Sequence, residues 1–256
     1  MSGMHEHELY RAILVGWFAL SAVTFIALFV KTAPYGRHDA RGWGPVVAPR
    51  WGWLLMESPA AIVMPALALP ALRSDGWPIG WVLVGLWALH YANRGLVYPF
   101  RLRSKRPMPL VVVGLALFFN VVNGWLNARG LTVYGPELGR AAWSSPRVLV
   151  GLTLFLVGLG VNWDADRRLL GLPRGADGGY AIPRGGLFSL VSSPNYLGEL
   201  VEWLGFALAA GSMAGLSFFV WTFANLVPRA IAHHRWYGRT FPDYPVGRKA
   251  IFPFVL

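Results

Sequence analysis

Long uncharged stretches divide this chain, and they constrain its fold more than any other feature. The first covers residues 12–30, and about twenty apolar residues are needed to cross a bilayer as a helix. Only 14% of all residues are charged, against roughly a quarter in soluble domains. Further stretches with at most one charged residue cover residues 51–72, 77–98, 109–126, 148–163 and 203–228. The sequence therefore predicts an all-α bundle embedded in a membrane.

The number of membrane spans depends on the last stretch. It is either one long helix or the second part of a pair, in which a helix starting near Tyr196 is followed by a turn near Gly211, Ser212 and Gly215. With the pair there are seven spans, and 17 of the 23 Lys and Arg residues fall on one side, against 5 on the other. Because positive loops favour the cytoplasm, we expect seven transmembrane helices, an outer amino terminus and a cytoplasmic carboxyl terminus.

Polar side chains recur at helical spacing inside or beside these spans. An ionisable residue within a span costs roughly 2.5 to 3.5 kcal/mol on insertion scales, so each one needs a reason. One stripe on a single helix face is Tyr91, Arg94 and Tyr98. The other stripes are Asn162 and Asp166; Asn195, Glu199 and Glu202; and Asn225, Arg229, His233 and Tyr237. Four such faces near the positive side predict a polar site there, although hydrogen bonding between helices is the alternative.

Several kinds of site do not match the sequence. The nearest approach to a soluble dinucleotide motif is Gly158-Leu-Gly160, which lies inside a span and has Trp163 where the third glycine should be. The chain has no cysteine, and adjacent His233 and His234 point about 100° apart on a helix, so we expect no metal. The excess of positive charge favours a phosphorylated ligand or anionic lipid over nucleic acid in so apolar a chain. The long polar connection over residues 164–194 is expected to be functional.

Several motifs of this chain resemble those of one family. These are Val191-Ser-Ser-Pro-Asn-Tyr-Leu-Gly-Glu199 with Glu202-Trp203-Leu-Gly205, Pro228-Arg-Ala-Ile-Ala-His-His-Arg-Trp-Tyr237, Phe241-Pro-Asp-Tyr-Pro245 and Gly247-Arg-Lys-Ala-Ile-Phe-Pro253, together with Tyr35-Gly-Arg-His38, Trp53-Leu-Leu-Met-Glu57-Ser-Pro and Leu89-His-Tyr-Ala-Asn-Arg94. The later motifs are similar to several membrane reductases and to isoprenylcysteine methyltransferases. The earlier ones are similar to the steroid 5-alpha-reductases, so the resemblance to that family covers nearly the whole chain.

The resemblance implies a single domain that reduces 3-oxo-4-ene steroids with NADPH. Residues 1–130 would mainly face the steroid, and residues 148–256 would mainly bind the cofactor from the cytoplasmic side. Glu57 and Tyr91 would hold the steroid ketone, with Trp53 as a pocket wall. The residues implied to bind NADPH are Asn162, Asp166, Asn195, Glu199, Arg229, His233 and Tyr237, with Arg106, Arg174 and Arg248 as further candidates for its phosphates.

These residue types suit that chemistry. Hydride addition at carbon 5 pushes negative charge onto the ketone oxygen, and a buried hydroxyl and acid placed there would stabilise the enolate. Tyr91 is the expected donor, and Glu57, desolvated in the bilayer, is expected to be protonated and to share the hydrogen bond. Two positions depart from the family pattern: some relatives have a basic residue where Ala181 stands, and several have histidine in place of Ala232.

Other functions remain open at this stage. They are a related sterol or enoyl reductase, a methyltransferase that uses S-adenosylmethionine, and a transporter, although no internal repeat typical of transporters is visible. We expect the steroid to enter from the membrane lipids and no obligate protein partner. The membrane would be the inner membrane of a bacterium or the endoplasmic reticulum of a eukaryote.

Overall fold

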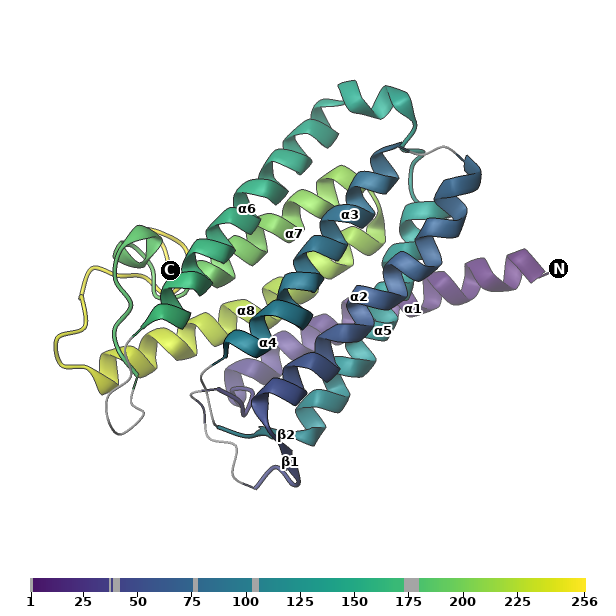
Figure 1. Cartoon of the computed structure of the whole chain (residues 1–256). Helices are drawn as coiled ribbons and strands as arrows, with labels where there is room; N and C mark the ends of the chain where they lie inside the picture. Colours follow the sequence, from purple (N-terminus) through teal and green to yellow (C-terminus); the bar gives the residue numbers. More distant parts are fainter. Residues whose placement is uncertain (1, 37, 39–41, 76–77, 103–105, 173–179) are drawn as a thin grey trace.

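The computed structural model describes the chain except residues 1, 37, 39–41, 76–77, 103–105 and 173–179. Its helices form an elongated bundle (Figure 1). The long helices are α1 (Ser2–Val30), α2 (Pro49–Asp75), α3 (Pro78–Ala92), α5 (Leu110–Thr132), α6 (Pro146–Gly171), α7 (Pro194–Ala210) and α8 (Met213–Thr240). The short elements are β1 (Val46–Val47), η1 (Asn93–Val97), α4 (Tyr98–Arg101), β2 (Met108–Pro109), η2 (Arg140–Ser144) and η3 (Gly186–Ser189).

Helix α3 continues through η1 into α4 without leaving the helical path. The middle section, η1, is a π-helical turn, and such turns inside α-helices frequently occur at functional sites. Arg94 lies in this turn. The two short strands β1 and β2 pair antiparallel and join the approach to α2 with the start of α5.

Five helices are long and apolar enough to cross a membrane: Met4–Val30, Pro49–Leu72, Leu110–Thr132, Pro146–Gly171 and Met213–Thr240. The prediction of a multi-span membrane protein is therefore confirmed at that level. The remaining two of the seven predicted spans correspond to the interrupted helix α3–η1–α4 and to α7, which has only 17 residues. Seven spans and their orientation stay predictions.

The predicted helix pair at the end of the chain is present. Helix α7 ends at Ala210, and the positive φ of 62° at Gly211 is the left-handed conformation typical of a residue just after a helix. Ser212 then caps α8 by accepting a hydrogen bond from the Gly215 backbone. One boundary was wrong: the polar connection predicted from residue 164 begins only after Gly171, because α6 continues past its apolar part.

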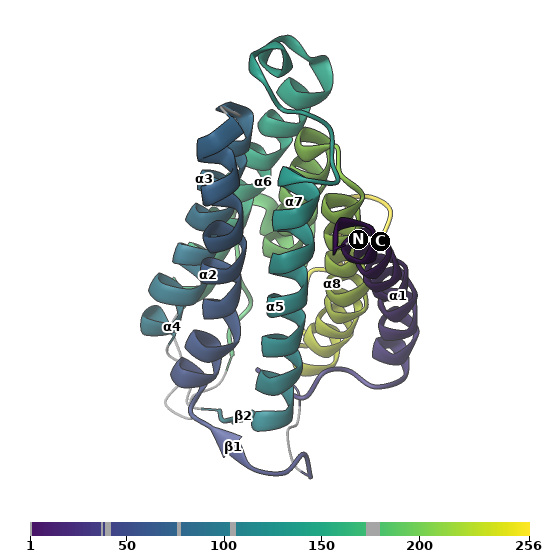
Figure 2. The same ribbon diagram turned by 90° about the vertical axis from the view of Figure 1, so that its right-hand side faces the viewer.

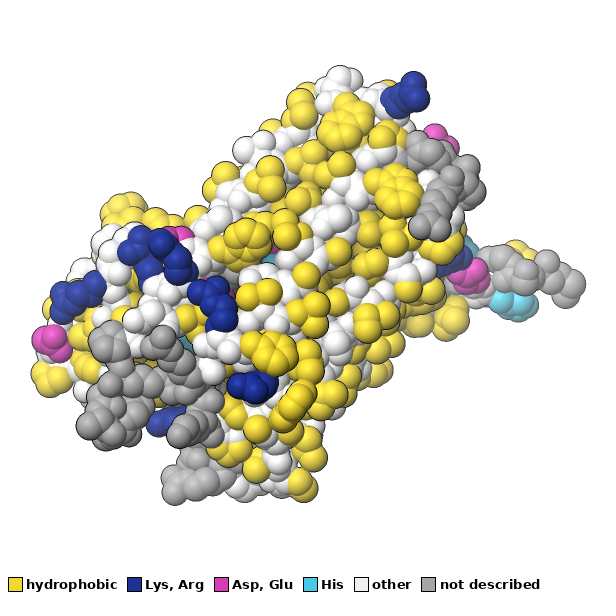
Figure 3. Space-filling model, viewed as in Figure 1, with side chains coloured by type: hydrophobic (Ala, Val, Ile, Leu, Met, Phe, Trp, Pro, Cys, Tyr) yellow, Lys and Arg dark blue, Asp and Glu magenta, His cyan; other side chains and the backbone are white. Residues whose placement is uncertain are grey.

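The helices pack in neighbouring pairs. Helix α6 packs against α7, α2 against α5, and α1 against α8 (Figure 2). The main buried cluster is centred on Trp87, Trp203, Phe155 and Phe206, which join α3, α6 and α7. On the face shown in Figure 3, apolar side chains cover the helices, and Lys and Arg gather toward the end where α6 and α8 finish.

Candidate active site

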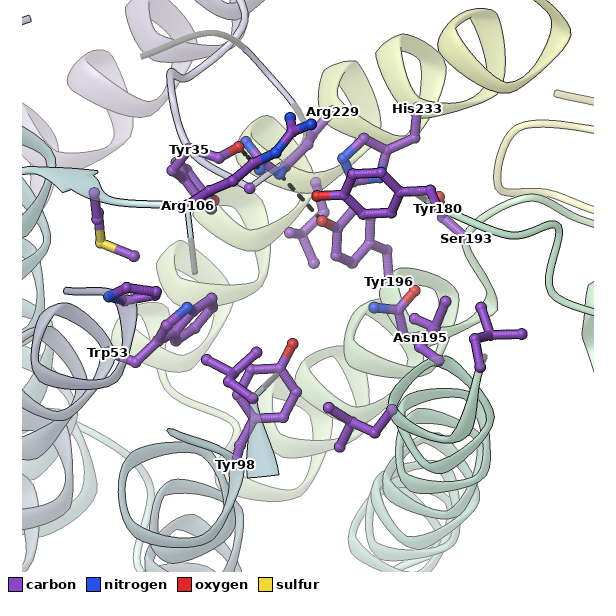
Figure 4. Close-up of a pocket in the computed structure, with 18 of the residues that line it drawn as sticks. Tyr35, Trp53, Tyr98, Arg106, Tyr180, Ser193, Asn195, Tyr196, Arg229 and His233 are labelled. Atoms are coloured by element: carbon purple, nitrogen blue, oxygen red, sulfur yellow. Dashed lines mark hydrogen bonds between the residues drawn. The ribbon is translucent and has the colours of Figure 1, made fainter. Parts of the chain in front are cut away.

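A cavity of about 220 Å³ lies at the end of the bundle where α4 and α6 finish and α7 begins (Figure 4). Its walls come from the connection before α2, from α2, η1 and α4, and from the second half of the chain. The polar and aromatic residues that line it include Tyr35, Trp53, Arg94, Tyr98, Arg106, Tyr180, Ser193, Asn195, Tyr196, Arg229, His233 and Tyr237. It is therefore rich in cationic groups and hydroxyls.

Arg229 on α8 fastens one wall of this cavity. Its Nε donates to the Tyr196 hydroxyl at 3.1 Å, and its Nη1 and Nη2 donate to the carbonyl oxygens of Ala33 and Tyr35 at 3.3 and 3.0 Å. The guanidinium also lies 3.6 Å from the centre of the Tyr35 ring (Figure 4). Gly36, with a φ of 71°, lets the chain turn there. Arg229 thus holds the connection after α1 against α7 and α8.

The Tyr35 hydroxyl is a neutral group in this arrangement. Burial raises the pKa of Tyr35, and the charge of Arg229 opposes only part of that effect. At neutral pH the phenol therefore keeps its proton and can donate a hydrogen bond into the cavity.

Arg94 is the centre of a buried ion network. Its Nη1 lies 3.2 Å from Asp166 Oδ2 on α6, and its Nη2 lies 3.3 Å from Glu199 Oε1 on α7. All three side chains are at most 12% exposed. The rings of Trp53 and Tyr98 lie 4.8 and 5.0 Å from the guanidinium carbon, so Arg94 is also bounded by aromatic faces. One cation thus joins two acidic residues that sequence analysis had placed on separate stripes.

Two asparagines complete this network. Asn195 Nδ2 donates to Asp166 Oδ1 at 3.3 Å. Asn162 Nδ2 donates to the Asn195 carbonyl oxygen at 3.1 Å and to Glu199 Oε1 at 3.2 Å. These contacts confirm that the predicted polar faces of α6 and α7 meet. They become possible because α6 and α7 approach closely at Gly158 and Gly198.

Glu57 and Tyr91 lie deeper than the residues that line the cavity. Glu57 follows Trp53 by one turn of α2 and is half-buried, and its Cβ would lie 3.4 Å from a Cβ added at Gly95. Tyr91 is 4% exposed and packs against Trp87. Arg94, one turn after Tyr91, connects this pair with the cavity.

Comparisons with known proteins decide the family. The family model described as 3-oxo-5-alpha-steroid 4-dehydrogenase matches residues 106–256. The chain is 41% identical over 255 residues to a steroid 5-alpha-reductase of Gossypium hirsutum, with 98% of both chains covered. It is 41% identical over 244 residues to 3-oxo-5-alpha-steroid 4-dehydrogenase 1 of Bos taurus, with 93% of both chains covered.

The chain belongs to the steroid 5-alpha-reductase family. The resemblance stated from the motifs is thereby confirmed. The matched relatives extend over α1 to α4, which carry Trp53, Glu57 and Tyr91, as well as over the second half.

In this steroid 5-alpha-reductase relative, the other predicted cofactor residues lie around the same cavity. The His233 ring is stacked on that of His38, with centroids 5.2 Å apart. Tyr237, 1% exposed, is stacked on Tyr244 at 5.1 Å, and the Arg106 guanidinium lies 5.3 Å from the Tyr180 ring. Arg174 lies outside the described residues.

Arg248 is placed differently from the other predicted cations. It is 5% exposed, lies 5.2 Å from the Tyr244 ring, and is not among the residues that line the cavity. Its Nε and Nη1 have no hydrogen-bond partner among the described residues. The Ser193 hydroxyl, which does line the cavity, likewise has none there. Buried donors without acceptors indicate a place for an acceptor from outside the chain.

Sequence reasoning missed some residues of the site. Arg94 and Tyr98 stood out as a polar stripe, but no binding role was given to them. Tyr35 and Tyr196 occur in the quoted motifs, and their contacts with Arg229 identify them here. Within the described part of the chain, no group of three or more histidines and acids is arranged to hold a metal.

Proposed function

We propose that this protein reduces the 4,5 double bond of 3-oxo-4-ene steroids to give 5-alpha-3-oxosteroids, with NADPH as hydride donor. The observation that carries the proposal is its membership of a family whose members are named for this reaction. The position of Arg94 supports it: Arg94 lines the cation-rich cavity, Tyr91 lies one helical turn before it, and Glu57 lies against the next residue, Gly95. Reaction and cofactor sites must be adjacent for hydride transfer.

The donors around the cavity fit a phosphorylated dinucleotide. The guanidinium of Arg106 and the Ser193 hydroxyl, which line the cavity, suit phosphate oxygens, and so do the Arg248 donors outside its lining that have no hydrogen-bond partner among the described residues. The Tyr180 and Tyr196 rings offer flat faces for an aromatic base. The predicted set of Asn162, Asp166, Asn195, Glu199, His233 and Tyr237 would hold the remaining polar groups. Arg229 would contribute mainly by fastening the cavity wall, since its nitrogens already donate to the chain.

Tyr91 and Glu57 would carry the catalytic work of the chain itself. When NADPH is bound, it supplies the hydride for carbon 5. Negative charge then develops on the 3-oxygen of the steroid, where the Tyr91 hydroxyl donates a hydrogen bond and protonated Glu57 donates a second. Exclusion of water from this buried position makes both interactions stronger than they would be in solution. Trp53, on the same face of α2 as Glu57, would form part of the steroid wall.

We further propose seven spans with a cytoplasmic cofactor site and a steroid that enters from the lipid. Residues 1–130 would mainly form the steroid side and residues 148–256 the cofactor side, with Arg94 as the link between them. The gathering of Lys and Arg toward the end of the bundle where α6 and α8 finish supports this orientation (Figure 3).

The decisive experiment is NADPH oxidation by the detergent-purified protein with progesterone or testosterone. The ring junction of the product is assigned by mass spectrometry against standards. A 5-alpha-dihydro product would establish the reaction and the substrate class together. NADPH binding without turnover would reject these steroids and direct the search to other sterols or enoyl compounds. Binding of S-adenosylmethionine without binding of NADPH would reject the reductase assignment.

A further inference from the structure

A buried histidine and a buried glutamate form a pair that the proposed mechanism has not used. His90 on α3 and Glu202 on α7 are joined through Nδ1 and Oε1 at 2.8 Å. His90 is 5% exposed and Glu202 is 0% exposed. The second oxygen of Glu202, Oε2, has no hydrogen-bond partner among the described residues. The pair is therefore enclosed by the protein, and only one of the two Glu202 carboxylate oxygens is hydrogen-bonded within the described residues.

Stability alone does not account for this pair. Taking two ionisable groups out of water costs several kcal/mol each, and apolar residues of similar volume often replace buried ion pairs without loss. The cost is higher in a membrane span, where ionisable residues usually mark proton or substrate paths. The surrounding cluster of Trp87, Trp203 and Phe206 is otherwise apolar and could have been completed with apolar side chains.

The position of the pair connects it with Tyr91. The His90 and Tyr91 rings are in contact, with centroids 5.0 Å apart and planes at 75°. Trp203 contacts both rings, at 4.7 and 5.9 Å. A movement of the His90 ring would therefore change the packing around the Tyr91 ring.

Further charged groups surround the pair from each neighbouring helix. They are Arg94 on η1, Glu57 on α2, Asp166 on α6 and Glu199 on α7. Glu199 lies one turn before Glu202 and is linked through Arg94 to Asp166, whose other oxygen meets Asn195 at the cavity. Titratable groups thus extend from the cavity to Tyr91.

The proposed reaction needs such a path. Reduction of a carbon–carbon double bond by a hydride consumes one proton, and a Tyr91 hydroxyl that gives up its proton must regain one before the next turnover. The site lies inside a helix bundle in a membrane, so the proton has to pass through side chains or enclosed water.

We propose that the His90–Glu202 pair is the internal proton source for Tyr91, an inference that rests on the proposed function. In each turnover the Tyr91 O–H bond breaks as its proton passes to the 3-oxygen of the enolate. A His90 N–H bond then breaks as the Tyr91 O–H bond forms again, and His90 regains a proton from Glu202. Glu202 is reprotonated from the cavity side, so one proton from water is consumed. Conversion of the enol to the ketone moves the same proton from oxygen to carbon 4.

Glu202→Gln tests this role. Glutamine has the same shape, and its amide oxygen can still accept a hydrogen bond from His90, but it cannot carry the proton. When the variant loaded with NADPH is mixed rapidly with steroid, one NADPH per protein should be oxidised at the wild-type rate, because Tyr91 begins protonated. Later turnovers should be about 100-fold slower than in the wild type, within the range typical of a lost proton-transfer group.

Two further variants sharpen the result. His90→Gln should show the same initial phase followed by slow turnover. Thr222→Val is the matched control, because it removes one buried hydrogen bond, from Thr222 to the Phe218 carbonyl oxygen, and takes away none of the proposed proton carriers. It should retain wild-type kinetics. NADPH affinity, measured in all three proteins, shows that the fold is intact.

The possible results separate the inference from the proposed function. Unchanged steady-state turnover in Glu202→Gln and His90→Gln would overturn the inference. An initial phase slowed as much as the later turnovers would also overturn it, because a purely structural defect affects both. If the wild-type protein itself reduces no steroid, the proposed function has failed instead.

Discussion

At the scale of single residues, the Tyr91 hydroxyl is the group on which the proposed chemistry depends most. Replacing it in Tyr91→Phe keeps the ring that packs against Trp87 and removes only the donor. We expect turnover to fall by about 100- to 1,000-fold, the usual loss when one donor to a developing oxyanion is removed. NADPH affinity should stay within about twofold of the wild type. The test therefore combines steady-state kinetics with a titration of NADPH binding. Near-normal turnover would rule out Tyr91 as the donor.

Arg94 is the residue whose loss should most disturb stability. In Arg94→Gln the carboxylates of Asp166 and Glu199 lose their shared cation while they stay buried. Breaking a buried ion pair by removing one partner typically costs about 3–5 kcal/mol, so the melting temperature in detergent should fall clearly. Exposed Arg239→Gln serves as the control and should melt like the wild type. Equal melting of both variants would mean that the two acids do not need Arg94.

The sequence revealed the members of this network, including Arg94, but not that Arg94 joins the two acids. Asn162, Asp166, Asn195 and Glu199 fall at helical spacing, which is a local property that periodicity detects. The position of Arg94 beside α6 and α7, which are far from it in sequence, depends on the π-helical turn and on tertiary packing, and periodicity detects neither.

At the scale of elements, the contact between α6 and α7 depends on glycines. A Cβ added at Gly158 would lie 2.6 Å from the Gly198 carbonyl oxygen, which no real side-chain atom tolerates. Gly158→Ala should therefore force α6 and α7 apart and weaken NADPH binding by about tenfold or more, since Asn162 and Glu199 bond across this contact.

Gly160 provides the comparison on the same helix. Nothing lies within 4 Å of a Cβ added there, and alanine favours a helix over glycine by up to about 1 kcal/mol. Gly160→Ala should bind NADPH normally in the same titration. Equal affinities in the Gly158 and Gly160 variants would show that close packing of α6 on α7 does not determine the cofactor site.

The end of α6 is a feature that the sequence did not predict. The uncharged stretch ends at Trp163 and the polar connection is predicted from residue 164, but α6 continues to Gly171. Asp164 pairs with Arg167 at 2.6 Å and with Arg168 at 2.7 Å, at the spacing of one helical turn. Charge marked the edge of the apolar region, not the end of the helix.

At the scale of the whole molecule, the absence of cysteine makes the orientation directly measurable. With the protein produced in a bacterial inner membrane, Glu137→Cys, in the exposed connection between α5 and α6, should react with a membrane-impermeant maleimide on intact cells. Val246→Cys, fully exposed beyond α8, should react only after the membrane is opened. Labelling of both positions on intact cells would contradict seven spans with a cytoplasmic carboxyl terminus.

Because Arg229 lies on the last helix, the cavity can be completed only late in the synthesis of the chain. It belongs to the final long helix, yet it grips the carbonyl oxygens of Ala33 and Tyr35 just after the first. A chain still emerging from the ribosome has made every other helix before this arginine appears. The cavity therefore cannot close around a ligand on an unfinished chain, and a protein truncated before α8 keeps the connection after α1 but lacks Arg229, His233 and Tyr237, which complete the cavity.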